Sequence, residues 1–264
     1  MTVAIGLARA GVEIKSFYRE RDQLVFTFAL PVVLLLLLGS LFDGTYEGTT
    51  VTSAQYMVPS MMAAGVASAS FLNLGISIAA DRENGTLKRL RGLPMNMASY
   101  VIGKVAVVLV VAAVQIALML AIGVFLFDLA LPTDAARWFT FGWVLLLGTV
   151  ACALLGVAAS QVARSAASAG TAMNLLHLVL AFLSGIYFTP ISALPGPLAT
   201  IGALFPLKWM GQGLRSALLP DAIVSVESTG SWEHGRTAVV LAAWCVGGLV
   251  LCLAALRLRA RRDG

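Results

Sequence analysis

Long apolar runs separated by short polar connections dominate the pattern of this 264-residue chain. A helix needs roughly 20 apolar residues to cross about 30 Å of hydrocarbon. The runs lack the alternation of a transmembrane barrel strand, so their backbone polar groups must be satisfied within helices. The pattern therefore predicts an all-α membrane protein with six spanning helices. These are Leu24–Phe42, Gln55–Ala79, Val105–Phe127, Trp138–Ser160, Ser168–Phe188 and Thr237–Leu256.

A shorter amphipathic stretch, residues 1–23, precedes the first run. Its apolar residues recur at steps of three and four, which puts them on one stripe of a helix. They are Val3, Leu7, Ala10, Ile14 and Phe17. We expect this helix to lie along the inner membrane surface, with Arg9 and Glu13 off the stripe and paired across one turn. It either anchors the chain only or also transmits motion.

The segment 189–236, between the fifth and sixth runs, is apolar but too broken by prolines to cross a bilayer. The prolines are Pro190, Pro195, Pro197 and Pro206. Ile191–Phe205 is typical of a re-entrant or interfacial pair of short helices. We expect an amphipathic helix next, with its apolar residues on one face and Gln212 and Arg215 exposed on the other.

Two patterns inside the runs bear on packing and transport. Small residues at every fourth position of the fourth run predict close contact with another helix. They are Gly148, Cys152, Gly156 and Ser160. The polar side chains at depth indicate either hydrogen bonds between helices or a pathway. They are Asn73, Gln115, Asn174 and His177.

Composition and charge agree with a membrane location and set the orientation. The chain is 59% hydrophobic and 12% charged, and its mean hydropathy is +0.90. Most of the 18 Lys and Arg residues fall in the amino-terminal segment, the 80–104 connection and the 257–264 tail. Basic connections stay in the cytoplasm, so we expect both termini there and a multi-pass protein of the inner or plasma membrane. The net charge of +5 is thus a topology signal, and we expect no nucleic-acid partner.

The connection at 80–104 concentrates charge between two apolar runs. The Asn84-Gly85 pair permits a tight turn, and the Leu93-Pro94 pair ends the short helix that follows it. Leu87 and Leu90 share one face of that helix and are surrounded by basic residues. The pattern fits a docking knob for a cytosolic partner, or else an ordinary solvated loop.

This connection, DRENGTLKRLRGLPMNMASYVIGK, resembles the one after the second span in permeases of type 2 ATP-binding-cassette exporters. The order of six spans and an amphipathic amino-terminal helix matches too. So does FLSGIYFTPISALPGPL followed by FPLKWMGQGLR, which is similar to the external segment of the daunorubicin-resistance branch. In similar permeases this external segment caps the exit of the pathway. Here it caps the exit or is a structural lid.

The resemblance implies that the connection is a coupling helix seated in a separate ATPase subunit. The coupling positions are Glu83, Gly85, Thr86, Leu87, Arg89, Leu90 and Pro94, with Arg164 as a lesser contact. No phosphate-binding loop motif occurs in the sequence, so ATP and Mg are expected in the partner chain and no cofactor in this one. Two ATPases and a second permease copy or paralogue would complete the unit within membrane lipid.

The implied cargo is an amphiphilic drug, lipid or secondary metabolite, moved outward between the second and fifth spans of the two halves. Candidate pathway residues are Met57, Met61, Phe71, Asn73, Asn174 and His177. A glycan or lipid-linked glycan exporter of the same family is the alternative. An ATP-independent carrier or channel is less favoured, because no Asp or Glu lies deep in a predicted span. Ser184 and His177 share one span, but no G-x-S-x-G motif supports an intramembrane serine protease.

Overall fold

The computed structural model describes residues 2–19, 21–42, 44–86, 89, 97–163, 165–187, 195–227 and 229–260. Its elements in this part are all helical, with one isolated antiparallel bridge between Thr45 and Thr52. They are α1 (Thr2–Arg19), α2 (Arg21–Leu41), α3 (Ser53–Ala67), the π-helix η1 (Ser68–Asn73), α4 (Leu74–Glu83), α6 (Met97–Phe127), α7 (Ala135–Val162), α8 (Ala166–Leu183), α9 (Gly196–Gly202), α10 (Pro206–Leu218), the 3-10 helix η3 (Asp221–Val226) and α11 (His234–Ala260). The predicted all-α class is confirmed.

Within the described residues, five helices are long and apolar enough to cross a membrane. They are Ser53–Glu83, Ser99–Phe127, Ala135–Val162, Ala166–Leu183 and His234–Ala255. These correspond to the second to sixth predicted spans. The first predicted span is also a helix, α2, but its apolar part is the shorter stretch Thr27–Leu41. A sixth span therefore stays a prediction.

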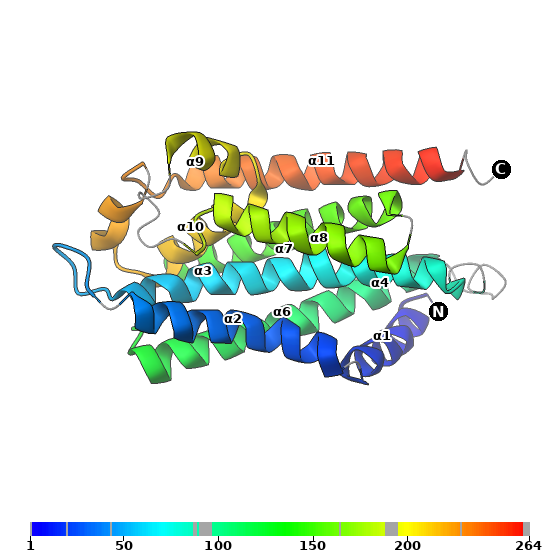
Figure 1. Ribbon diagram of the computed structural model, residues 1–264, viewed down its shortest axis with the longest axis horizontal. Helices are drawn as coiled ribbons and strands as arrows, with labels where there is room; N and C mark the ends of the chain where they lie inside the picture. Colours follow the sequence, from blue (N-terminus) through cyan, green and yellow to red (C-terminus); the bar gives the residue numbers. More distant parts are fainter. Residues whose placement is uncertain are drawn as a thin grey trace.

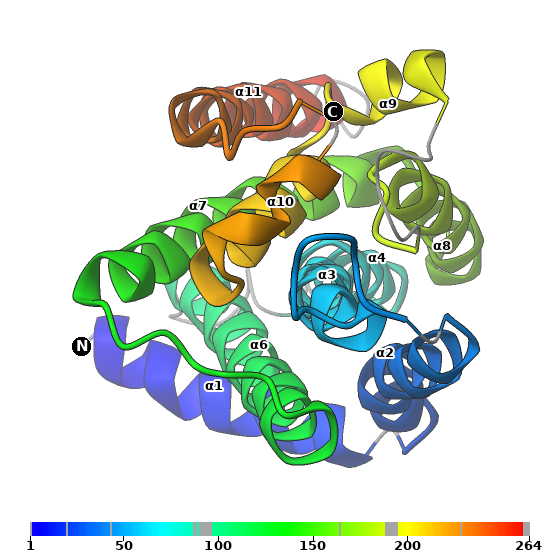
Figure 2. The same cartoon turned by 90° about the vertical axis from the view of Figure 1, so that its left-hand side faces the viewer.

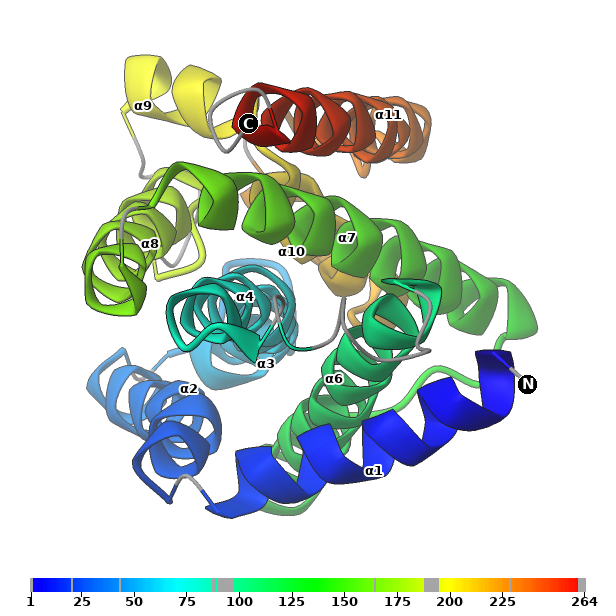
Figure 3. The same cartoon turned by 90° about the vertical axis from the view of Figure 1, so that its right-hand side faces the viewer.

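The helix of the second predicted span, Ser53–Glu83, is built from α3, η1 and α4; it forms the centre of the bundle, and we call it the central helix (Figures 2 and 3). Of its most apolar window, 78% is buried inside the protein, against 17–28% for the other four spans. The small residues of the central helix let its neighbours pack closely around it. A Cβ atom added at Gly65, for example, would lie 2.5 Å from the Gln115 side chain of α6.

The described ends of α1 and α11 lie at one end of the bundle, which we call the terminal end; the opposite end is the distal end (Figure 1). Helix α1 packs along α6 at the terminal end (Figure 3). Ala10 and Phe17 of the predicted stripe are buried and Ile14 is half-buried. The side chains of Val3 and Leu7 fall outside the described part. The predicted Arg9–Glu13 ion pair is confirmed at 2.7 Å.

The line of small residues in α7 is confirmed as a packing surface. All four residues are buried, and Cys152 lies between Gly148 and Gly156 on that line. A Cβ atom at Gly156 would lie 2.5 Å from the carbonyl oxygen of Phe71 in η1, and one at Gly148 would clash with Met210 of α10. The absence of side chains at these glycines lets α7 approach the central helix and α10.

The segment between the fifth and sixth spans differs from its prediction. Of the expected short helix pair over Ile191–Phe205, the described part contains α9, while residues 188–194 lie outside it. The expected exposure of Gln212 and Arg215 is wrong, because both side chains are fully buried. Helix α10 lies between α3 and α7 (Figure 2). Arg215 tolerates this burial because a buried carboxylate, that of Glu227, pairs with it.

Candidate functional site

Three consecutive charged residues, Asp81, Arg82 and Glu83, end the central helix and contact three different elements. The Asp81 carboxylate accepts a hydrogen bond from the Tyr100 hydroxyl at 3.0 Å and pairs with Lys104 Nζ at 2.6 Å. Both partners belong to α6. Asp81 therefore joins the terminal ends of two spans.

Arg82 and Glu83 join the same end of the central helix to the turn between α7 and α8. The Arg82 guanidinium donates to the carbonyl oxygens of Ser160 and Ala163, at the end of α7. Such carbonyls have no partner within their own helix, and a cation satisfies them. Glu83 Oε2 accepts from the Ala166 backbone amide, 2.6 Å away, where a carboxylate suits the first turn of α8.

Lys104 links a third element, α1, to this end of the bundle. Its buried Nζ lies 2.8 Å from Glu13 Oε2 and 2.6 Å from Ser77 Oγ. Glu13 is thus shared between Lys104 and Arg9 rather than facing solvent. We call Arg9, Glu13, Asp81, Tyr100 and Lys104 the terminal charge cluster. The sequence indicated only two parts of this cluster. Arg9 and Glu13 are one helical turn apart, and Asp81 and Lys104 lie at the two edges of one connection.

Only some of the predicted coupling positions lie among the described residues. Glu83 has the contact above, and Gly85 has a φ of +69°, which favours glycine in the predicted tight turn. Thr86 follows in a helical turn, and Arg89 Nη2 donates to the Asn84 carbonyl oxygen at 2.9 Å. Leu87, Leu90, Pro94 and Arg164 lie outside the described residues. Their predicted docking role stays a prediction.

A cavity of about 940 Å³ runs along the central helix between α1, α2, α6 and α8, and we call it the large cavity. Met61, Asn73, Asn174 and His177 line it, so the structure brings four of the six candidate pathway residues together. Glu13, Asp81 and Lys104 also line it. The cavity therefore extends from the terminal charge cluster to the middle of the bundle.

The remaining two candidates lie elsewhere. Met57 is fully buried in the core. Phe71 lines a second, almost wholly apolar cavity of about 310 Å³ on the other side of α8, which we call the small cavity. His177 lines both cavities and so separates them.

The polar residues at depth divide between packing and cavity. Asn73 Nδ2 donates to Thr27 Oγ1 of α2 at 3.0 Å, a hydrogen bond between helices. Asn174 instead donates to the Gly170 carbonyl of its own helix. Gln115 is fully buried, and its amide atoms have no partner among the described residues. Ser184 Oγ also lacks a partner there, so it makes no hydrogen bond with His177.

These features, charges at one end of the central helix and a cavity beside it, match what a membrane transport subunit requires. Residues 10–219 match the ABC-2 type transporter family. The chain belongs to this family. Its members are permease subunits of transporters rather than enzymes, and they normally work with ATPase partners. With its apolar helices, this ABC-2 permease is a multi-pass membrane protein.

Three named relatives are similar to this chain over two thirds of its length or more. The chain is 23% identical over 177 residues to the probable multidrug ABC transporter permease YbhR of Escherichia coli (strain K12), covering 67% of this chain and 47% of that protein. It thus spans about half the length of that relative. It is 27% identical over 251 residues to the daunorubicin resistance ABC transporter permease protein DrrB1 of Streptomyces coeruleorubidus, covering 91% of this ABC-2 permease and 80% of that protein. The putative transport permease YvfS of Bacillus subtilis (strain 168) is 22% identical over 201 residues, 76% and 80% of the two chains.

Proposed function

We propose that this ABC-2 permease is the membrane subunit of an ATP-driven exporter of an amphiphilic drug, lipid or secondary metabolite. Two separate ATPase subunits bind ATP and Mg, and a second permease copy or paralogue completes the complex. Helix α2 serves as a sixth span, and the terminal end faces the cytoplasm. The names of YbhR and DrrB1 support this cargo class.

The observation that supports this most directly is that Asp81, Arg82 and Glu83 lie at the start of the predicted coupling connection and contact α6, α7 and α8. A displacement of that connection by an ATPase therefore moves the terminal ends of three spans together with the central helix. Because α6 and α8 also line the large cavity, this movement changes the shape of the cavity. ATP binding in a partner chain is thereby coupled to the pathway.

The lining of the large cavity favours an amphiphile over a glycan. Its terminal end carries the charged Glu13, Asp81 and Lys104, whereas its deeper wall includes apolar residues such as Met61 and Leu72. A cargo with one polar and one apolar end matches this gradient, and a uniformly polar glycan does not. The glycan exporter is therefore the second candidate, and within it a lipid-linked glycan, which also has one polar and one apolar end, fits the cavity better than a free glycan.

The test is purification of the tagged chain from its native membranes, comparing wild type with Leu87→Asp/Leu90→Asp. We expect an ATP-hydrolysing subunit to co-purify with wild type and to be lost from the double variant. The matched control is Leu131→Asp, an exposed leucine in the 128–134 connection at the distal end, which should retain the subunit. If no ATPase accompanies wild type and the purified chain moves solute alone, the ATP-independent carrier replaces this proposal.

A further inference from the structure

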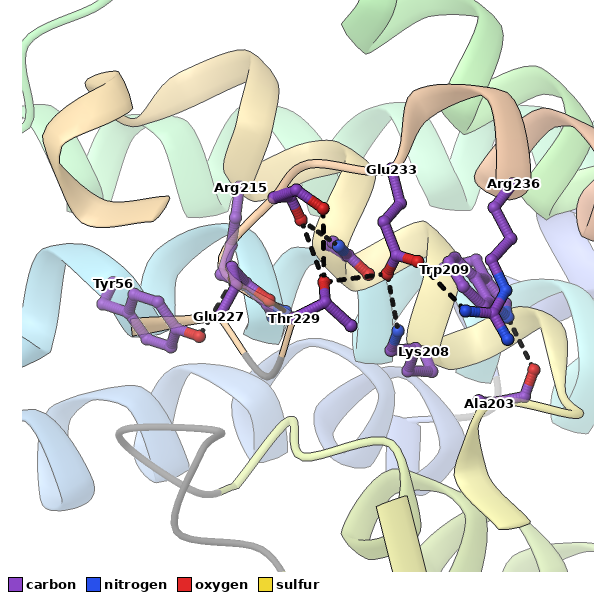
Figure 4. A network of polar contacts seen from close by, with 11 residues as sticks. Tyr56, Ala203, Lys208, Trp209, Arg215, Glu227, Thr229, Glu233 and Arg236 are labelled. Carbon is purple, nitrogen blue, oxygen red and sulfur yellow. Dashed lines mark hydrogen bonds and ion pairs between the residues drawn. The ribbon is translucent and has the colours of Figure 1, made fainter. Parts of the chain in front are cut away.

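A fully buried ion pair lies near the distal end of the bundle (Figure 4). Arg215 of α10 and Glu227, just after η3, have side chains that are 0% exposed. Arg215 Nε lies 2.5 Å from Glu227 Oε1, and Nη2 lies 3.0 Å from Oε2. This two-point bond fixes both the distance and the orientation of the two groups. Burial by itself would lower the pKa of Arg215, but the charge and hydrogen bond of Glu227 together with the nearby tyrosines outweigh burial, so the pKa of Arg215 is raised and its guanidinium stays charged.

The pair is attached to the central helix through two hydroxyl groups. Arg215 Nη1 donates to Ser60 Oγ at 2.9 Å, and the Tyr56 hydroxyl donates to Glu227 Oε1 at 3.1 Å. The guanidinium also lies 5.0 Å from the centre of the Tyr56 ring. Tyr56 and Ser60 are one turn apart on α3, so both hydrogen bonds join the pair to the same face of that helix.

Glu227 belongs to the connection between α10 and α11, residues 219–227 and 229–233, which we call the distal lid. Other polar contacts hold the lid to elements around the central helix. Asp221 pairs with Arg137 of α7, and Glu233 pairs with Arg236 of α11 and Lys208 of α10. The lid therefore stays attached to its neighbours if its link to the central helix is broken.

We propose that Arg215 and Glu227 form a releasable latch, which holds the distal lid on the central helix and lets go when that helix moves during transport. This inference rests on the proposed function, since it assigns the opening of the pathway exit. Tyr56 and Ser60 are the positioning residues that connect the latch to the central helix. The terminal charge cluster and the latch thus act on opposite ends of one helix.

The chemistry of the pair suits release better than an apolar contact does. A buried ion pair requires good geometry, and replacing such a pair by packed apolar residues is often neutral or stabilising. Stability alone therefore does not require charges here. A guanidinium and a carboxylate, however, are well solvated once separated, whereas apolar residues exposed by lid opening would oppose it. The pair is compatible with both a dry closed state and a wet open state.

The test uses Tyr56→Phe/Ser60→Ala in the complete permease–ATPase complex in liposomes. This variant removes the two hydroxyls but leaves the Arg215–Glu227 bond. We expect ATP hydrolysis to stay close to wild type, while daunorubicin transported per ATP falls by roughly tenfold, because two hydrogen bonds to charged groups are lost. The matched control, Ser225→Ala, removes an exposed lid hydroxyl that donates to the Ala222 carbonyl oxygen within the lid, and should not change this ratio. A wild-type ratio in the double variant would overturn the latch.

A second variant and a second measurement test the latch if the first experiment fails. If the double variant does not assemble, the isosteric Tyr56→Phe is used, with a smaller fall in the same ratio expected and an unchanged ratio counting against the latch. If wild type shows no ATP-dependent daunorubicin transport, daunorubicin is not its cargo, and the latch is judged on the permease by hydrogen exchange. Lid amides 221–227 should then exchange roughly tenfold faster in the double variant, and unchanged exchange would reject the latch.

Discussion

Glu83 accepts a hydrogen bond from the backbone amide of Ala166, which joins the last turn of the central helix to the first turn of α8. The two residues are 83 positions apart in the sequence. Because Glu83 belongs to the predicted coupling connection, this bond links that connection to the fifth predicted span. Helix α8 contributes Asn174 and His177 to the large cavity, so the bond lies between the coupling connection and the cavity wall.

Replacing Glu83 by Ala should weaken this link. The variant loses a charge-assisted hydrogen bond at a helix N-terminus, which stabilises by about 1 kcal/mol. We expect a small drop in thermal stability and a larger drop in transport per ATP. Glu83→Gln keeps an acceptor oxygen and should show a smaller effect. Glu47→Ala, which removes an exposed carboxylate at the distal end, serves as the control, and equal effects at both positions would contradict the assignment.

The terminal charge cluster should show strong coupling between its members. Lys104→Met leaves the Asp81 and Glu13 carboxylates without their shared cation, and we expect a loss of about 3 kcal/mol in the free energy of unfolding. Adding Asp81→Asn removes the carboxylate that is left without a cation, since Glu13 still pairs with Arg9. The double variant should therefore recover part of the loss in a double-mutant cycle. Additive losses would show that the two groups act independently.

The close approach of α7 to the central helix predicts a contrast between two glycines of α7. Gly156→Ala places a Cβ atom against the carbonyl oxygen of Phe71, 2.5 Å away, and should destabilise the protein by about 1–3 kcal/mol. Gly142 has nothing within 4 Å of such an atom. Gly142→Ala should therefore be neutral or stabilising, because Ala favours helix over Gly. Thermal unfolding in detergent measures both, and a destabilised Gly142→Ala would contradict this account.

The lowered pKa of Lys208 predicts that the folded protein becomes more stable at alkaline pH. Burial lowers the pKa of Lys208 to about 8 from 10.5, although Glu233 and Glu227 oppose this shift. Between these two pH values the unfolded chain binds a proton that the folded protein has released. The contribution of Lys208 to stability therefore increases as pH rises from about 8 to 10.5 and is constant below and above that window.

Lys208→Met removes the group that titrates and provides the comparison. Thermal unfolding of both proteins across this window should show wild type gaining stability relative to the variant. Parallel curves would mean that Lys208 keeps its ordinary pKa in the folded state.

Local patterns predicted much of the helical framework. The second to sixth spans follow from apolar runs of sufficient length, and the Arg9–Glu13 pair follows from a spacing of one helical turn. The close-packing line in α7 was likewise evident from small residues at every fourth position. Of the six candidate pathway residues chosen for their polar or flexible side chains, four line one cavity.

The sequence did not show which charged residues pair with one another. Asp81 and Lys104 were visible as charges of one connection, but nothing in the sequence indicated that Lys104 pairs with both Asp81 and Glu13. The periodicity of α10 even predicted the wrong environment for Arg215, because an amphipathic pattern identifies a polar face without showing whether that face meets water or a buried carboxylate.

The sequence by itself determined the class of protein and the helices, since apolar length and periodicity act through the nearest turns of the chain. Only the tertiary structure decided which helix lies at the centre, which charges share a buried site and how the distal lid is held. The physical reason is that a buried charge is stable only beside a specific partner, and the packing of helices distant in sequence brings that partner within bonding distance.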